Sequence, residues 1–237
     1  MKLCAGKRAL LPGALFLLLL LAGCGPFYRT VVVLVPAGNG DYEIDSELGA
    51  CKIEKAGVKV ALSFPKRKDL ETAAAYPEWN PYLNREKIFY TVFKLKVENA
   101  RQEKISIDIA KAVLLDGLGG QENALTSEYF KNVYPASTLV QPRGFRGFEP
   151  EVVYTEDHYR YNAVEKTIFK NRELYPGVKM EGYLVFNTAR REAGNLTVVV
   201  PGIKLLDGKN NEAGNTGDIR FRFTQNVSVK ETTDSGQ

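Results

Sequence analysis

The stretch that decides the fold is Lys87–Asn99, with the sequence KIFYTVFKLKVEN. Its first half is apolar almost throughout, and its second half alternates strictly between apolar and polar side chains. Alternation with a period of two is typical of an extended strand, because successive side chains point to opposite faces. The apolar residues that carry the pattern are Ile88, Tyr90, Val92, Phe93, Leu95 and Val97. The stretch therefore predicts a strand at the centre of an antiparallel sheet.

Similar strand patterns continue on both sides of this stretch. Upstream, Tyr28–Val35 is a β-branched run of strand length, and Cys51–Phe64 contains two short strands that meet at Lys55-Ala56-Gly57. Downstream, Ala112–Leu115 runs into Asp116-Gly117, which is a hairpin-type signal. Further strands are predicted around Ile105–Ile109, Val178–Phe186, Leu196–Val200, Ile203–Leu206 and Ile219–Phe223.

Residues 121–170 interrupt the β pattern and form a predicted helical insertion. Ser127–Val133 predicts a short helix and Pro150–Lys170 a longer one, since proline is tolerated in the first turn of a helix. A short Ala-rich helix is expected after Lys66-Arg67-Lys68, and the prolines of Tyr76–Pro81 predict an irregular loop. Many short strands with few helices favour a mainly β fold, arranged as a β-sandwich.

The order of the strands also carries a family resemblance. Tyr90–Asn99 and Ile105–Asp116, with Gly182–Asn187 followed by Asn195–Val200, resemble the immunoglobulin-like domains of small exported bacterial lipoproteins, including the DUF4352-type. The likeness covers roughly residues 85–225, and the long insertion departs from the compact form of that family. The resemblance implies an immunoglobulin-like antiparallel β-sandwich with short helical insertions.

The N-terminus has the three parts of a secretory signal. Lys2, Lys7 and Arg8 are cationic, Ala9–Leu21 is largely apolar, and small residues follow. The apolar run is shorter than the roughly 20 residues that a membrane-spanning helix needs. A cysteine stands directly after Leu21-Ala22-Gly23.

Leu21-Ala22-Gly23-Cys24 resembles the lipobox of bacterial lipoproteins. The resemblance implies a diacylglycerol on the Cys24 thiol, palmitate-type acylation and removal of residues 1–23, so that Cys24 anchors the protein in membrane lipid. Gly25 stands where an aspartate would retain the protein at the inner membrane, which favours the outer membrane, facing the periplasm, in a Gram-negative cell. The alternative is a plain signal peptide with an incidental cysteine.

The predicted organisation follows from these segments. Residues 1–23 are the signal peptide, 24–27 the lipidated N-terminus with a short tether, 28–229 one β-sandwich domain, and 230–237 a disordered polar tail. We expect a protein of the cell envelope.

Charge and cysteine content exclude several classes of function. Three of the 32 basic residues and none of the 28 acidic ones lie in the predicted signal, which leaves 29 against 28. That balance argues against nucleic-acid binding. Only Cys51 remains as a thiol, so no disulfide framework is expected. Cys51 is interpreted as a buried, inert thiol, with a reactive nucleophile as the alternative.

Motifs of catalysis and of cofactor binding are missing from the sequence. His158 is the only histidine, and zinc sites need three or four converging ligands, so we interpret it as a surface side chain on a helix. There is no nucleophile elbow and no phosphate-binding glycine loop. We therefore predict a non-enzyme without a cofactor, and an enzyme with an unrecognised site remains a minority hypothesis.

The region Arg143–Tyr161 combines arginine with aromatic residues. Such side chains suit protein interfaces, and they also suit carbohydrate or phosphate groups. The alternative is that the aromatic rings fix the insertion to the sandwich while the arginines face water. The candidate binding residues are Arg143, Arg146, Tyr154, Tyr159, Arg160 and Tyr161.

Two functions follow for a protein of this kind. The first is a membrane-anchored envelope lipoprotein that acts as a binding or structural component. The second is an envelope assembly factor that docks a partner protein through the insertion 121–170.

Overall fold

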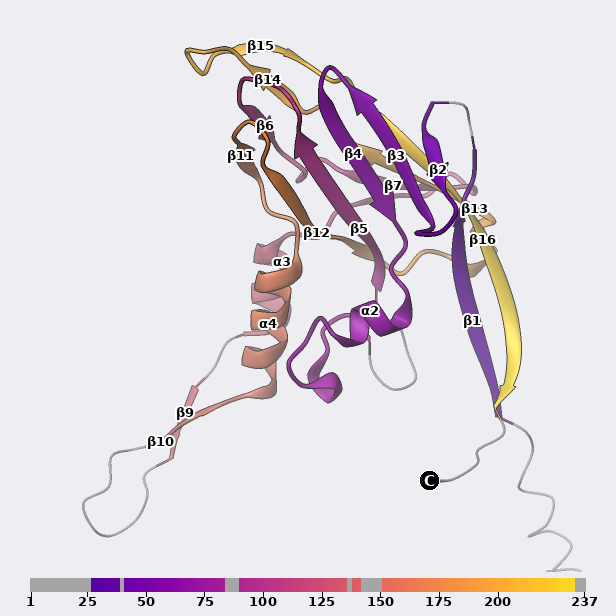
Figure 1. The fold of residues 1–237 in the computed structure, drawn as a ribbon. Helices are drawn as coiled ribbons and strands as arrows, with labels where there is room; N and C mark the ends of the chain where they lie inside the picture. The colour runs from indigo at the N-terminus through magenta and orange to yellow at the C-terminus, as the bar shows by residue number, and fades with distance from the viewer. Residues whose placement is uncertain (1–26, 39–40, 84–89, 136–137, 142–150, 233–237) are drawn as a thin grey trace, which may run out of the picture. The chain divides into compact units, whose positions relative to one another are not determined.

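The computed structural model describes residues 27–38, 41–83, 90–135, 138–141 and 151–232; the remaining residues are drawn in grey in Figure 1. The chain divides into two compact units, of which Val33–Asn226 is the larger. The smaller unit includes the first part of strand β1 (Phe27–Pro36) and the last part of strand β16 (Ile219–Thr232). All other described elements belong to the larger unit.

The fold is mainly β, with several antiparallel sheets and a few short helices, as the sequence predicts. One five-stranded sheet has the order β1-β16-β13-β7-β8, and the other has the order β12-β5-β4-β3-β2. The first contains β13 (Asn195–Val200), β7 (Val113–Asp116) and β8 (Gln121–Asn123). The second contains β12 (Lys179–Asn187), β5 (Tyr90–Asn99), β4 (Val58–Ser63), β3 (Ala50–Lys55) and β2 (Glu43–Asp45).

Two smaller sheets complete the β structure. A four-stranded sheet has the order β11-β6-β14-β15, and β10 pairs with β9 in a separate two-stranded ribbon. Their bounds are β11 (Arg172–Leu174), β6 (Ile105–Ile107), β14 (Lys204–Leu206), β15 (Glu212–Asn215), β9 (Thr138–Gln141) and β10 (Glu151–Tyr154). The described helices are α2 (Arg67–Glu71), α3 (Ser127–Val133) and α4 (Glu156–Thr167), with 3-10 turns η1 (Pro77–Trp79) and η2 (Arg191–Ala193).

Strand β5 lies inside its sheet, as its sequence predicts. It pairs antiparallel with β12 on one side and with β4 on the other. Residues 87–89 of the stretch that predicted it lie outside the described residues. The turn between β3 and β4 is also confirmed, because Ala56 and Gly57 both take positive φ angles, 49° and 75°, as a tight two-residue hairpin requires.

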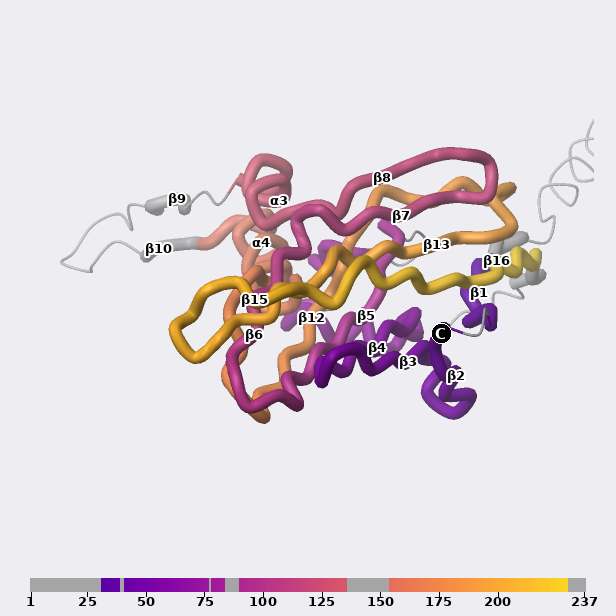
Figure 2. Tube along the Cα trace, turned by 90° about the horizontal axis from the view of Figure 1, so that it is seen from above, coloured from indigo at the N-terminus to yellow at the C-terminus, as the bar shows by residue number. Residues whose placement is uncertain are grey.

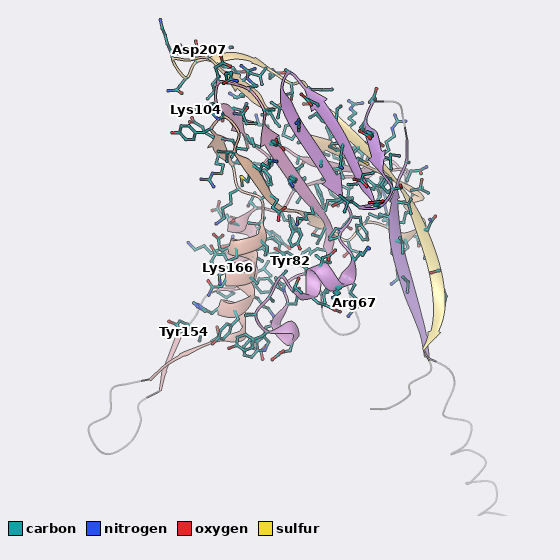
Figure 3. All side chains as sticks on the ribbon, viewed as in Figure 1. Arg67, Tyr82, Lys104, Tyr154, Lys166 and Asp207 are labelled. Atoms are coloured by element: carbon teal, nitrogen blue, oxygen red, sulfur yellow. The ribbon has the colours of Figure 1, made fainter. Side chains whose placement is uncertain are left out.

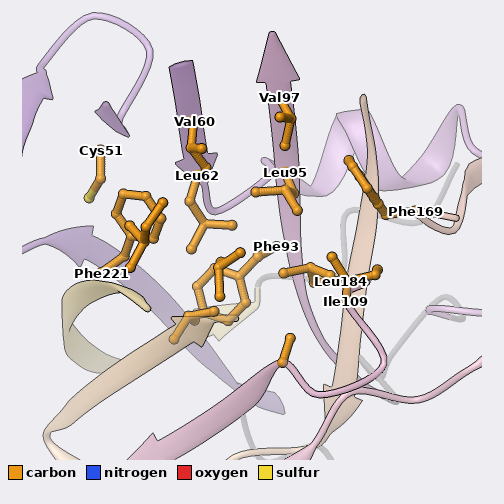
Figure 4. Packing of buried hydrophobic residues seen from close by; sticks show 14 of the residues in the cluster. Cys51, Val60, Leu62, Phe93, Leu95, Val97, Ile109, Phe169, Leu184 and Phe221 are labelled. Carbon is orange, nitrogen blue, oxygen red and sulfur yellow. The ribbon is translucent and has the colours of Figure 1, made fainter. Parts of the chain in front are cut away.

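Side chains from both five-stranded sheets contribute to one buried cluster, the main core. Phe93 and Leu95 of β5 lie there with Leu184 of β12, and so do Val198 of β13 and Phe221 of β16. Figure 4 shows part of this packing, with Phe93 near Leu62 and Leu95. In Figure 2, β7 and β13 run on one side of the view and β3 and β4 on the other.

A second cluster, the helix-side core, covers the opposite face of β5 and β12. Val92 of β5 and Val185 of β12 pack there against Phe130 of α3 and Val164 of α4. This second layer explains why the neighbours Val92 and Phe93 are both apolar, because they point to opposite faces of β5 and both faces are buried there. The cluster consists of Leu70, Tyr82, Leu83, Val92, Phe130, Val164, Ile168, Tyr183 and Val185.

The C-terminal end of α4 is fixed to β12 at a glycine. The Phe169 amide donates a hydrogen bond of 2.9 Å to the Tyr183 carbonyl, and an isolated bridge joins Ile168 to Tyr183. A Cβ atom on Gly182 would lie 2.7 Å from the Phe169 Cα atom, so a side chain at 182 would collide with backbone. Glycine at this position lets the chain that leaves α4 cross the strand closely.

The prediction of a helix over Pro150–Lys170 is wrong for its first turn. Residues 151–154 form β10, and α4 begins only at Glu156. Thr155 has extended backbone angles, and its hydroxyl accepts a hydrogen bond from the His158 amide, which is an N-cap. The β-branched pair Val152-Val153 precedes this cap and favours a strand. Pro150 lies outside the described residues.

Other boundaries also differ from the sequence prediction. Helix α2 includes part of the basic triplet, and its C-cap Thr72 precedes the alanines that were expected to be helical. The Asp69 carboxylate accepts a hydrogen bond from the Lys66 amide and so fixes the start of the helix. Strand β16 reaches Thr232, inside the predicted tail, and residues 233–237 lie outside the described residues. The predicted helix Ser127–Val133 is confirmed as α3.

Candidate functional site

The first turn of α4 carries the best-supported part of the predicted binding region. Tyr154 precedes the N-cap and stacks on His158, with ring centroids 4.2 Å apart and planes at 23°. Tyr159, one residue further on, lies 6.3 Å from Tyr154. Because a helix repeats every 3.6 residues, the cap at Thr155 fixes the direction in which these rings point.

A loop distant in sequence supplies two more rings. Trp79 ends η1, and its amide donates a hydrogen bond of 3.0 Å to the Tyr76 carbonyl. Trp79 stacks on Tyr159 at 4.8 Å and 25°, and Tyr76 lies 4.7 Å from Trp79 and 5.0 Å from Tyr159. We call the five side chains Tyr76, Trp79, Tyr154, His158 and Tyr159 the aromatic platform.

Buried polar groups hold this loop in place. Asn80, only 2% exposed, donates a hydrogen bond of 2.6 Å to the Leu70 carbonyl, and its side-chain oxygen accepts from the amides of Tyr82 and Leu83. The Tyr82 hydroxyl lies 2.5 Å from the Thr167 hydroxyl, which ties the loop to α4. These contacts fix the loop that carries Tyr76 and Trp79 against α4.

The platform remains partly open to solvent. Tyr76 is 42% exposed and Tyr154 is 45% exposed, while Trp79, His158 and Tyr159 are half-buried. In Figure 3, Tyr154 is labelled in the lower part of the view and Lys104 in the upper part. Because Trp79, Tyr76 and Tyr159 contact one another, they form a continuous apolar surface rather than a cage around an empty space.

The structure brings only some of the predicted binding residues together. Tyr154 and Tyr159 belong to the platform, whereas Tyr161 packs against the helix-side core. Arg160 points elsewhere, because consecutive helical residues are turned by about 100°. Arg143 and Arg146 lie outside the described residues.

Arg160 is engaged by its own helix. Its guanidinium lies 3.3 Å from Glu156 and 3.4 Å from Asp157, and it lies 5.9 Å from the centre of the Tyr134 ring. Burial raises the pKa of Tyr134, so that ring stays a neutral phenol beneath the cation. These contacts engage the guanidinium of Arg160 within its own helix, and its role in binding a partner or a ligand stays a prediction.

Sequence reasoning missed Tyr76 and Trp79 as parts of the site. Their segment was interpreted only as an irregular loop, because two prolines surround it. The available signal was the only tryptophan of the chain, placed three residues after a tyrosine in a loop. What the sequence could not show was that this loop meets α4 in the fold.

The interpretation of Cys51 as a buried thiol is confirmed. The side chain is fully buried in the main core, beside Tyr42, and burial raises the pKa of the thiol to about 11. A thiol with a raised pKa and no exposure is a poor nucleophile near neutral pH, because the thiolate is the reactive form.

His158 has no cluster of metal ligands around it. Within the described residues, no group of three or more His, Cys, Asp or Glu side chains is arranged to hold a metal ion. His158 lies on helix α4, as predicted, and its ring is half-buried and stacked on Tyr154.

A hollow of about 300 Å³ lies elsewhere on the larger unit, between the start of α3 and the chain that leaves α4. Its lining includes Ile109, Leu125, Phe169 and Lys170, and the Lys170 ammonium is paired with Glu165 at 3.0 Å. The platform residues do not line it.

In the part of the chain that the structure describes, no helix is long and apolar enough to cross a membrane.

Comparisons with known proteins give little. No protein-family model matches the chain, and no curated protein matches it. Among solved structures, the X-ray structure of Northeast Structural Genomics Consortium target SoR45 matches over 89% of this chain and 90% of that chain, with 5% identity and a TM-score of 0.26. A likeness this weak carries no argument about fold or function.

Proposed function

We propose that this protein is a lipid-anchored lipoprotein of the cell envelope that acts as a non-catalytic binding component. Its proposed anchor is Cys24, acylated and held in the membrane, in the outer membrane facing the periplasm where the cell is Gram-negative. The proposed fold is an immunoglobulin-like β-sandwich, and the proposed binding surface is the aromatic platform.

The sandwich proposal is supported by the composition of the main core. Two five-stranded antiparallel sheets each contribute buried side chains to one cluster, and the ring of Phe93 in β5 lies 5.0 Å from the ring of Phe223 in β16, a strand of the other sheet. Sheets that share one core in this way are typical of sandwich folds.

The observation that carries the binding proposal is the exposure of a pre-positioned aromatic cluster. Tyrosine and tryptophan dominate the binding energy of protein interfaces, because they combine large apolar area with a hydrogen-bonding group. Burying the rings of Tyr76 and Tyr154 would lower the free energy of the protein, and each ring is instead about four-tenths exposed. Their exposure in a fixed arrangement is therefore consistent with a surface that a partner covers.

The position of Tyr154 and Tyr159 favours the second candidate, an assembly factor, as a specific form of this function. Both residues lie in the insertion 121–170, the segment through which the assembly-factor hypothesis has the protein dock its partner. The two candidates share the same surface and differ in whether the partner is being assembled.

The binding proposal is tested by photocrosslinking in intact cells. A photoreactive phenylalanine analogue at position 154 is compared with one at Tyr175, which is 59% exposed and carries Lys104 4.5 Å above its ring. We expect a discrete adduct from position 154 and none from position 175. Loss of any adduct at 154, or the same adduct from both positions, would contradict the proposal.

The anchor proposal has its own test. Cys24→Ala is expected to abolish metabolic labelling by palmitate and to release the protein from the membrane fraction, because the thiol is the site of acylation. Cys51→Ala serves as the matched control and should leave labelling intact. Membrane attachment that survives Cys24→Ala would refute the anchor.

A further inference from the structure

The chemistry of the platform points to the kind of partner it accepts. The two elements that carry its rings, η1 and the first turn of α4, contain three carboxylates, Glu78, Glu156 and Asp157. Arg160 is the one basic residue in these same stretches, 77–79 and 154–160, and it pairs with two of the carboxylates. Three carboxylates and one arginine give these stretches a net charge of −2.

These carboxylates lie at the surface, although two of them share one cation, Arg160. Glu78 is exposed, and the side chains of Glu156 and Asp157 are 61% and 39% exposed. Aromatic rings also attract cations, because the face of a ring carries partial negative charge, and tryptophan is the strongest of them. The rings and the carboxylates therefore both favour a positively charged ligand.

We propose that the aromatic platform docks a cationic segment of a partner polypeptide, with an arginine or lysine side chain lying on the rings and its charge beside Glu78 and Glu156. This inference rests on the proposed function and specifies its partner. The apolar stem of such a side chain covers the surface of Trp79 and Tyr76, while its charged end stays near the carboxylates. Phosphate ligands are disfavoured, because they would meet carboxylates and a neutralised Arg160.

The chain offers a direct probe of this surface. Trp79 is its only tryptophan, so tryptophan fluorescence, excited at a wavelength that the twelve tyrosines do not absorb, reports on the platform alone. The experiment titrates the full-length, detergent-solubilised lipoprotein with a penta-arginine peptide, a penta-glutamate peptide and a neutral chito-oligosaccharide. Calorimetry on the same mixtures detects binding that leaves the fluorescence unchanged.

We expect saturable binding of penta-arginine and none of penta-glutamate. Raising the ionic strength from about 0.1 M to about 1 M shortens the Debye length from about 10 Å to about 3 Å, so the affinity should fall. Penta-arginine that fails to bind in both measurements, penta-glutamate that binds as well, or a chito-oligosaccharide that binds in its place with no salt dependence would each overturn the proposal.

Variants locate the binding on the platform. Tyr159→Ala should weaken penta-arginine binding by about threefold to fivefold through loss of a ring. Glu78→Gln keeps every ring and should weaken binding by about twofold at low salt. Tyr175→Ala, which removes an exposed tyrosine outside the platform, is the matched control and should leave the affinity unchanged. Equal losses in Tyr159→Ala and Tyr175→Ala would overturn the placement of the binding on the platform.

The peptide titration and the crosslinking experiment distinguish a failure of this inference from a failure of the proposed function. If a discrete adduct forms at position 154 in cells while penta-arginine does not bind, the binding function stands and the cationic partner is wrong. If neither is observed, both fail.

Discussion

The loop around η1 and the insertion 121–170 each carry aromatic side chains of two kinds. Some of these rings are buried in the helix-side core, and others form the aromatic platform. Tyr82, three residues after Trp79, is fully buried in the helix-side core, where its ring meets Tyr183 edge-on at 5.5 Å. Phe130 is also fully buried there, against Tyr90 at 5.4 Å. In contrast, Trp79 and Tyr159 lie in a platform whose other tyrosines are exposed.

The difference between the two groups lies in what surrounds them. The helix-side core is covered by β5 and β12 on one side and by α3 and α4 on the other, and the hydroxyl of Tyr183 donates to the Asp69 carbonyl inside the protein. The platform is built on a 3-10 turn and on the start of a helix, where there is no second layer of described strands. One group holds the helices to the sheet, and the other presents a rigid apolar surface.

The largest expected effect on stability comes from removing a ring of the helix-side core. Phe130→Ala removes a fully buried ring and should lower the free energy of unfolding by about 3 to 5 kcal/mol, since the surrounding core cannot fill the cavity. Urea unfolding followed by circular dichroism measures it. The matched change Tyr159→Ala should cost about 1 kcal/mol or less. Equal costs would show that the platform belongs to the core.

Asn80 links the two groups and should give the next largest effect. Asn80→Ala leaves the Leu70 carbonyl and the amides of Tyr82 and Leu83 without their partner, which should cost about 2 to 3 kcal/mol. Because the loop also carries Trp79, we expect its fluorescence emission to shift toward that of a solvent-exposed indole. Unchanged emission in the folded variant would show that Asn80 does not hold the platform.

A pH dependence sharpens the contrast between the main core and the surface. Burial raises the pKa of Cys51 from 9.0 to about 11, so the folded protein keeps a proton that the unfolded chain loses first. The stabilising contribution is full below about pH 9 and is lost as the pH rises toward about 11, by up to about 2 kcal/mol. Urea unfolding across this range should show it. Cys51→Ala should remove that part of the slope, and an identical slope in the variant would contradict the assignment.

The smallest expected effect concerns Arg160. Its ion pairs with Glu156 and Asp157 lie on a partly exposed helix face, where such pairs contribute about 0 to 0.5 kcal/mol. Arg160→Gln should therefore leave the unfolding free energy almost unchanged, as thermal unfolding can test. A loss above about 1.5 kcal/mol would mean that its contact with Tyr134 supports the core.

The strands were predictable because their signals are local. Val58, Val60 and Leu62 alternate with polar or small residues, and Lys55-Ala56-Gly57 marks the turn before them, so β3 and β4 could be placed from the sequence. Short strands such as β11 and β15 were missed, because most of their residues are exposed and show no alternation of apolar and polar side chains. Strand β10 was hidden by the strong helix signal that follows it.

The candidate site was only half predictable, for a related reason. Tyr154 and Tyr159 stood out through their density in one segment, but their direction depends on where α4 begins, and that boundary was placed several residues too early. Tyr76 and Trp79 meet Tyr159 through a contact between segments about eighty residues apart. Local patterns contain no information on such contacts, so the platform required the structure.

The most direct test of the central claim is the yield of the photocrosslinked adduct from position 154 in a Tyr159→Ala background. We predict that the protein stays folded and membrane-attached while the adduct is lost, because the neighbouring ring shapes the surface that the partner contacts. An undiminished adduct in the folded variant would contradict the account, since it would show that the partner does not recognise the aromatic platform.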